Sequence, residues 1–137
     1  MADFEVTKIQ AAVLQLNWSI RLFLDHEAYI PSITLAAAAE EILGKCVDGS
    51  AAHATLKKRF SEEFQLKAKL VSDEHLNKVR NWLKHNQNGD PFEKASIDLE
   101  NEAIQFIARA LFNLTSISQP LPSEGQRFLS FVGIKQQ

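Results

Sequence analysis

The sequence predicts an all-α fold: an antiparallel bundle of about five helices followed by a short C-terminal helix. Apolar residues recur at helical spacings of three and four along most of the chain. The 137 residues include only 5 Gly and 4 Pro, too few for the many turns of a β-rich domain. Hydrophobic residues make up 45% and charged residues 23%, which is typical of one globular domain spanning 1–137.

The first 49 residues carry the pattern of two helices. The first is expected over roughly 4–25, where an apolar seam recurs at helical spacing: Ile9, Val13, Leu16, Ile20 and Phe23. The second has Pro31 in its first turn, where proline is tolerated, and ends near Asp48-Gly49. Its Ala36–Ala39 run has no bulky side chain, so a neighbouring helix can approach closely.

The middle of the chain predicts two more helices and a loop. Ser50 is a candidate cap for a polar third helix over about 51–69. Ser72, followed by two acidic residues, is a candidate cap for a fourth helix over about 73–86. The run from Asn86 to Pro91 then contains the clearest loop composition in the sequence.

A fifth helix and a docked tail complete the expected bundle. Asp98 is the predicted N-cap of the fifth helix, and its core stripe is Ile104, Ile107, Leu111 and Leu114. Two prolines at 120 and 122 interrupt the chain after it. Because the 127–132 tail contains Phe128, Leu129 and Phe131, we expect it to pack on the bundle.

Charge and cysteine content narrow the classes of function. The net charge of −2 excludes a global basic surface for nucleic acid, whereas residues 53–94 hold nine Lys and Arg against six Asp and Glu. The single Cys46 excludes an internal disulfide and suits a reducing compartment. The N-terminus lacks the apolar region of a signal peptide, and the longest apolar run, 35–39, is too short for a bilayer. We therefore expect a cytoplasmic protein that makes no membrane contact.

One stretch of the fourth helix has a pattern suited to chemistry. Val79 and Leu83 lie on its core face, whereas Arg80, Lys84, Asn81 and His85 follow one another around its polar side. Arg80 and His85 stand at the two margins of that side, about 140° apart and about 7.5 Å apart along the axis. No acidic residue interrupts the run, and no spacing of His, Cys, Asp and Glu resembles a metal site.

These residue types suit phosphate chemistry. The guanidinium of Arg offers a planar fork of donors that matches phosphate oxygens. The imidazole of His takes and gives protons near neutral pH, and the amide of Asn orients a hydroxyl or a phosphate oxygen. Neither a metal nor another cofactor is required if the nucleophile is the 2′-hydroxyl of RNA. A solvated helix face is the alternative interpretation of the same residues.

The stretch Arg80-Asn81-Trp82-Leu83-Lys84-His85 resembles the motif of the HEPN family, the higher eukaryotes and prokaryotes nucleotide-binding domains. That motif is an Arg, usually followed by a polar residue, with a His a few positions later. Residues 38–45 and 127–129 also resemble a group of small prokaryotic HEPN-like proteins. The helical plan of the family, a bundle with the motif late in a core helix, covers most of this chain.

The resemblance implies a metal-independent endoribonuclease. Many members are homodimers whose two motifs meet in one composite cleft, and many bacterial ones are toxins paired with a nucleotidyltransferase-type antitoxin. At matching positions, His85 would be the general acid or base, Arg80 would bind the scissile phosphate, and Asn81 would position the substrate or His85. Lys84 is not a motif residue, but its positive charge makes it a candidate RNA contact. The expected products carry a 2′,3′-cyclic phosphate and a 5′-hydroxyl.

Two further expectations accompany this hypothesis. Because Arg80 and His85 point apart on one helix, a two-fold partner is expected to bring Arg80 of one chain near His85 of the other. Glu40 and Glu41 of the second helix are candidates to lie nearby, although an exposed acidic residue is the simpler interpretation of each. The alternatives to a ribonuclease are a non-catalytic module for dimerisation or for binding a nucleotide or partner, and a purely structural bundle.

Overall fold

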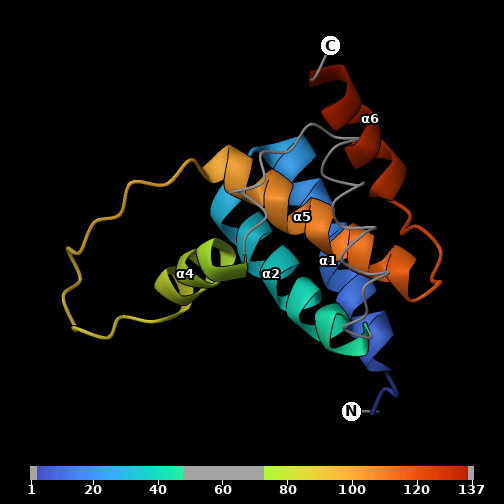
Figure 1. Cartoon of the computed structure of the whole chain (residues 1–137), viewed down its shortest axis with the longest axis horizontal. Coiled ribbons are helices and arrows are strands. Elements are labelled where there is room, and N and C mark those ends of the chain that lie inside the picture. The colour runs from blue at the N-terminus through green and yellow to red at the C-terminus, as the bar shows by residue number, and fades with distance from the viewer. Residues whose placement is uncertain (1–2, 48–72, 136–137) are drawn as a thin grey trace.

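The computed structural model describes residues 3–47 and 73–135, and all regular structure within these ranges is helical (Figure 1). The helices are α1 (Lys8–His26), α2 (Tyr29–Cys46), α4 (Asp73–Lys84), α5 (Leu99–Ser116) and α6 (Gly125–Lys135). The all-α prediction is thus confirmed for this part of the chain. The helix expected over 51–69 and its candidate cap Ser50 lie outside the described residues, as does Ser72.

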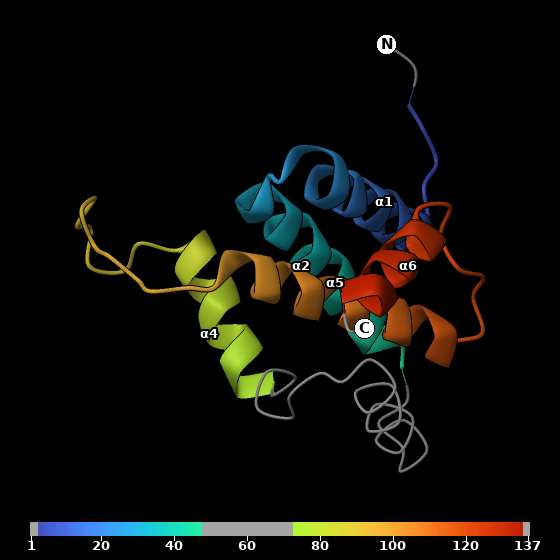
Figure 2. The same ribbon diagram turned by 90° about the horizontal axis from the view of Figure 1, so that it is seen from above.

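Helix α2 lies at the centre of the bundle. It forms a hairpin with α1 on one side and packs against α5 on the other. Figure 2 shows α4 standing at one side of this three-helix core and α6 lying near α1 at the other. Of the described helices, α2 is the one against which α4 chiefly packs. The placement of α4 therefore depends on α2.

Small residues bring α1 and α2 close together, as the alanine run of α2 predicts. Ala36, Ala37 and Ala39 are buried. The hydroxyl of Ser19 on α1 donates to the Ser32 carbonyl at 2.7 Å, and the Ser32 hydroxyl donates to the Ser19 carbonyl at 2.9 Å. This reciprocal pair satisfies two buried hydroxyls, which is the condition for burying them without a large cost.

Local capping explains where α1 begins. The Thr7 hydroxyl accepts from the Gln10 backbone N–H at 3.0 Å, and the Gln10 side chain accepts from the Thr7 N–H at 2.8 Å. This capping box starts α1 at Lys8, so the predicted start at residue 4 was too early. Helix α2 begins at Tyr29, two residues before Pro31, and ends at Cys46, before the predicted stop.

Helix α5 follows its prediction closely. The Asp98 carboxylate accepts from the Asn101 N–H at 3.1 Å, and the predicted stripe is buried. However, α5 is buried on most of its circumference, so polar residues such as Gln105 are buried as well. Residues 85–98, which include the predicted loop from Asn86 to Pro91, separate α4 from α5 by a long segment without regular structure (Figure 1).

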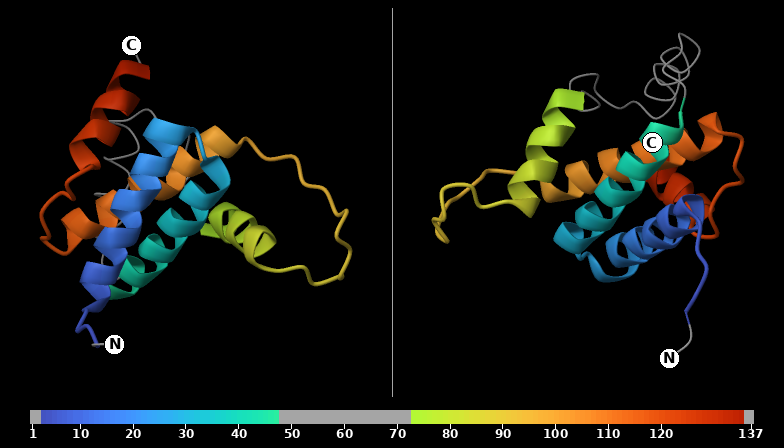
Figure 3. Two further views of the ribbon diagram at one scale, coloured as in Figure 1. Left: turned by 180° about the vertical axis from the view of Figure 1, so that it is seen from behind. Right: turned by 90° about the horizontal axis from the view of Figure 1, so that it is seen from below.

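The C-terminal helix packs on the bundle, as its apolar residues predict (Figure 3). Phe128 and Val132 are buried, and the ring of Phe23 on α1 contacts the rings of Phe128 and Phe131 with centroid separations of 6.1 and 5.3 Å. On the surface, Arg127 donates to Asp25 of α1 at 2.5 Å, and this hydrogen bond holds the pKa of the Asp25 carboxyl below its ordinary value. Helix α6 is thus fixed to α1 by aromatic contacts and an ion pair.

The close packing of α2 predicts a position-dependent response to added volume. Ala36→Leu should lower the free energy of unfolding by about 1–3 kcal/mol, because Ala36 is fully buried and a larger side chain must displace its neighbours. Ala38→Leu is the matched control, since Ala38 is only half-buried on the same helix. Urea unfolding followed by circular dichroism measures both. Equal midpoints for the two variants would contradict the proposed packing.

Candidate functional site

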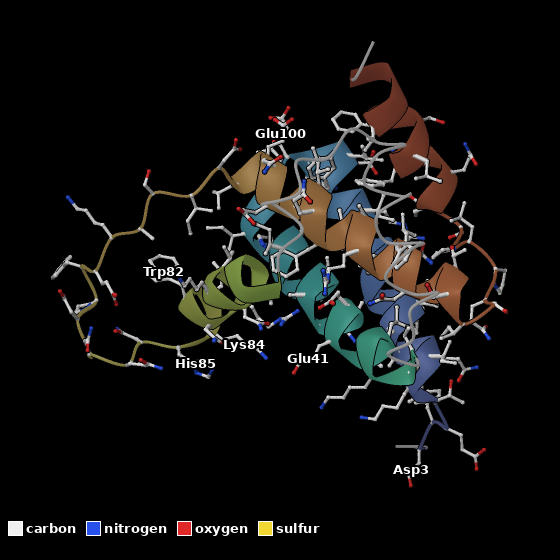
Figure 4. All side chains as sticks on the ribbon, in the orientation of Figure 1. Asp3, Glu41, Trp82, Lys84, His85 and Glu100 are labelled. Atoms are coloured by element: carbon white, nitrogen blue, oxygen red, sulfur yellow. The ribbon has the colours of Figure 1, made fainter. Side chains whose placement is uncertain are left out.

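Helix α4 presents its two sides to different surroundings. Val79 is buried and Leu83 is half-buried, and both pack against the core. Figure 4 shows Lys84 and Glu41 in the region between α4 and α2, whereas Trp82 and His85 lie on the side of α4 away from α2. The amphipathic pattern of α4 thus assigns the candidate site residues to two separate regions.

On the α2 side, one carboxylate binds two guanidinium groups. Glu40 accepts from Arg80 through Oε2 and from the Nε of Arg109 on α5 through Oε1 at 2.8 Å. The three side chains are only 12% (Arg80), 10% (Glu40) and 15% (Arg109) exposed. We call Glu40, Arg80 and Arg109 the Glu40 cluster. It joins α2, α4 and α5 at one point.

Further contacts fix the guanidinium of Arg80. Its Nη1 donates to Asn77 Oδ1 at 2.6 Å, and its guanidinium lies 5.6 Å from the centroid of the Phe106 ring. The backbone of Glu40 is fixed as well, because Asn113 Nδ2 donates to the Glu40 carbonyl at 3.4 Å. A buried ion pair is costly to desolvate, and such contacts are what make it tolerable. Arg80 therefore has a defined position.

The Glu40 cluster opens onto a cavity of about 320 Å³, which we call the Arg80 cavity. Its lining residues are Glu40, Glu41, Gly44, Lys45, Asn77, Arg80 and Arg109. The lining holds three basic side chains against two acidic ones. A cavity of this composition favours an anion over a cation.

Lys84 lies on the same side of α4 as Arg80. Its Nζ is 3.9 Å from Glu41 Oε2, and both side chains are substantially exposed. Lys84 and Glu41 also line a neighbouring cavity of about 460 Å³, together with Lys8 and Lys45. The exposed Glu41 agrees with its predicted solvation. For Glu40, the same expectation of an exposed acid was wrong, because that side chain is buried in the Glu40 cluster.

On its other side, α4 borders a different cavity, of about 300 Å³, which we call the Trp82 pocket. Its lining residues come from α4 and from the segment after it: Lys78, Asn81, Trp82, His85, Gln87, Asn88 and Glu93. Asn81 and His85 are exposed. The backbone N–H of His85 donates to the Asn81 carbonyl at 2.9 Å, so His85 continues the last turn of α4.

The four predicted site residues thus fall into two pairs. Arg80 and Lys84 face α2, whereas Asn81 and His85 line the Trp82 pocket. The Arg80 cavity and the Trp82 pocket have no lining residue in common. Within one chain, therefore, the described residues do not bring Arg80 and His85 onto a common point.

Sequence reasoning named Glu40 as a candidate to lie nearby but not as a buried partner of Arg80, and it missed the second guanidinium, that of Arg109. Arg109 is the only charged residue between 103 and 123, and it lies in the stretch of the fifth helix that carries the predicted apolar stripe. A lone charge at such a position needs a buried partner of opposite sign, and this signal was present in the sequence.

Comparisons of the chain with protein-family models, with curated proteins and with solved structures find no match. Within 3–47 and 73–135, no helix has both the length and the hydropathy needed to cross a membrane. Over those same ranges, no three side chains of His, Cys, Asp or Glu gather as metal ligands would.

The Glu40 cluster predicts a large difference between two neighbouring carboxylates. Glu40→Gln should lower the free energy of unfolding by roughly 3 kcal/mol or more, because it leaves two buried guanidiniums without their shared anion. Glu41→Gln removes only an exposed pair and should cost less than about 1 kcal/mol. Denaturant unfolding of the two isosteric variants measures the difference. If Glu40→Gln is as stable as Glu41→Gln, the cluster does not hold α4 in place.

Proposed function

We propose that this protein is a homodimeric, metal-independent endoribonuclease of the HEPN type. The observation that carries the proposal is the arrangement on α4: Arg80 is held by Glu40 at a mainly basic cavity, while His85 is exposed at the end of the same helix. The sequence resemblance of residues 80–85 supplies the reaction class, and this arrangement supplies a fixed guanidinium and an accessible imidazole. These groups can supply the proton transfer and the charge stabilisation that metal-independent cleavage of RNA uses.

Arg80 has the donors needed for a phosphate. A guanidinium carries five N–H groups, of which Glu40 and Asn77 accept one each. The Nε–H of Arg80 is buried and has no acceptor among the described residues, so the N–H groups left for a phosphate are the second ones on the two Nη atoms. Glu40 acts as a positioning residue, because it fixes the plane of the guanidinium before the substrate arrives.

The reaction proceeds by attack of the 2′-oxygen on the adjacent phosphorus. The new P–O2′ bond forms as the P–O5′ bond breaks, and the products are a 2′,3′-cyclic phosphate and a 5′-hydroxyl. One proton leaves the 2′-hydroxyl and one is added to the departing 5′-oxygen; His85 performs one of these transfers, and a water molecule performs the other. Arg80 stabilises the negative charge that builds on the phosphate oxygens. Asn81 orients the substrate beside His85, and Lys84 contacts the RNA backbone.

The separation of the two cavities favours a composite site. A phosphate at Arg80 of one chain needs an imidazole from elsewhere, because His85 of that chain lines the Trp82 pocket instead. A two-fold axis near α4 supplies it from the second chain. The family resemblance extends the proposal to a cytoplasmic toxin controlled by a nucleotidyltransferase-type antitoxin.

Loss of the imidazole should abolish the reaction. His85→Ala should reduce the RNA cleavage rate by about 10²–10⁴-fold, because general acid–base catalysis contributes that much. The assay uses a labelled RNA with EDTA present throughout, and the product ends are identified by mass spectrometry. His26→Ala is the matched control, since His26 is likewise an exposed His near the end of a helix.

The result for His85 decides the catalytic assignment. Wild-type cleavage must persist in EDTA and leave cyclic phosphate ends, and His26→Ala must cleave as the wild type does. If His85→Ala also cleaves at the wild-type rate, His85 is not the general acid or base. Size-exclusion chromatography with light scattering on each variant checks that the dimer is intact.

Subunit mixing tests whether the site is shared. Arg80→Ala and His85→Ala proteins should each be inactive alone, and mixing them after partial denaturation and refolding should restore cleavage. A mixed dimer pairs Arg80 of one chain with His85 of the other, whereas no chain in the mixture carries both residues. Refolding each variant alone is the control. An inactive mixture in which mixed dimers are detected by mass spectrometry would place the reaction within one chain.

A non-catalytic binding module is the second candidate. It is favoured by the contacts of Arg80 with Glu40 and Asn77, which also suit a structural role, and by Leu14 and Trp18, which are exposed on α1. This function predicts no EDTA-resistant cleavage of RNA by the wild-type protein. It predicts instead that a nucleotide or a partner protein binds stably to the intact chain.

A further inference from the structure

We propose that the Trp82 pocket binds one unpaired nucleobase of an RNA strand, with the indole of Trp82 as the surface on which the base stacks. This inference rests on the proposed function in taking RNA as the ligand. It assigns a base-binding role to Trp82 and to the segment after α4, both of which lie outside the Arg80–Asn81–His85 set. It also predicts that the substrate is single-stranded where it contacts the protein, since a paired base cannot enter a pocket.

The first support is the exposure and setting of Trp82. Its side chain is 39% exposed, although a ring of this size is usually well buried on a helix that packs against a core. The ring borders a pocket of about 300 Å³, at the lower end of the range for small-molecule sites. That volume accommodates one base rather than a folded nucleic acid.

The second support is the chemistry of the other lining residues. Asn81, Gln87 and Asn88 contribute three carboxamides, and each carboxamide offers both donors and an acceptor. Unpaired bases present the same mixture of groups on their edges, and proteins read them with such side chains beside an aromatic platform. A polar pocket with one aromatic wall therefore fits a base better than it fits an apolar peptide side chain.

The third support is that the wall formed by the 86–93 segment is pre-organised. The Asn86 carbonyl accepts from the Gly89 N–H at 3.2 Å, and Asn86 Nδ2 donates to the Asp90 carbonyl at 3.2 Å. The Asp90 carboxylate accepts from the Phe92 N–H at 2.9 Å. Gly89 has a φ of 71°, a left-handed conformation that glycine adopts without strain. These bonds define a turn, so binding a base need not order the whole segment.

The position of His85 connects this pocket to cleavage. His85 lines the Trp82 pocket beside Trp82 and Asn81. A base stacked on Trp82 therefore lies next to the imidazole, and its own ribose is the one nearest to His85. The nucleobase site would in this way select which 2′-hydroxyl His85 meets.

The tryptophan content of the chain allows a direct binding test. The sequence has only two tryptophans, Trp18 on α1 and Trp82 on α4. Trp18→Phe leaves Trp82 as the only indole, and titration with a 2′-O-methyl oligonucleotide, which cannot be cleaved through its 2′ position, should quench its fluorescence saturably. Trp82→Phe leaves only Trp18 and should show no saturable quenching. Quenching that is equal in both variants, or absent from the Trp18→Phe protein, would overturn the inference.

Affinity measurements show whether binding needs an aromatic ring at position 82 or only a large apolar side chain. Trp82→Ala should weaken binding of a fluorescein-labelled 2′-O-methyl oligonucleotide about tenfold or more, as expected for loss of one stacked base. Trp82→Phe should largely restore the affinity because it keeps an aromatic face, whereas Trp82→Leu, apolar but not aromatic, should not. Trp18→Ala is the matched control, since Trp18 is 55% exposed on another helix.

The possible outcomes distinguish this inference from the proposed nuclease. Cleavage that depends on His85 but is unaffected in Trp82→Ala, with unchanged oligonucleotide affinity, rejects the base site and leaves the nuclease standing. Quenching of Trp82 without cleavage retains the base site and rejects the nuclease. If Trp82→Ala dissociates the dimer while each chain binds the oligonucleotide as before, Trp82 is a protein contact and the inference is wrong.

Discussion

The buried carboxylate of Glu40 is the interaction on which the candidate site depends. It lies on α2 and binds guanidiniums from α4 and α5, so one side chain fixes three helices relative to one another. Helix α4 needs this contact more than the others do. It has 12 residues, a length at which an isolated helix is marginal in water, and it is followed by a long extended segment. The Glu40 contact therefore adds a directional constraint to the apolar packing of Val79 and Leu83 against the core.

The same constraint divides the chemistry of α4 between its two sides. Arg80 is committed to α2 because its acceptor lies there, and helical geometry then directs Asn81 and His85 away from it. A rigid guanidinium and an accessible imidazole thus come from one helix but not from one cavity. In the proposed enzyme, packing against the core would pre-organise Arg80, and a second chain would bring an imidazole to it.

Much of the fold could be predicted because its causes are local. The seam of α1, the Asp98 cap and the apolar tail each depend on residues within a few positions of one another. The Glu40 cluster could not be predicted in this way, since its contacts span 40 and 69 positions along the chain. Periodicity shows which face of a helix is apolar, but it does not show which helix faces it. An acidic residue beside an alanine run therefore looked solvated, although it is buried.

The charge distribution explains why RNA binding would need both the Arg80 cavity and the Trp82 pocket. The whole chain is slightly acidic, so non-specific attraction to a phosphate backbone is weak. The local excess of basic residues at the Arg80 cavity favours binding of a phosphate there. An RNA held this way needs a second, uncharged contact to gain affinity. Base stacking meets that need, since it is largely independent of net charge and tolerant of sequence. If the proposed function holds, recognition by one phosphate and one unpaired base would restrict cleavage to flexible single-stranded sites.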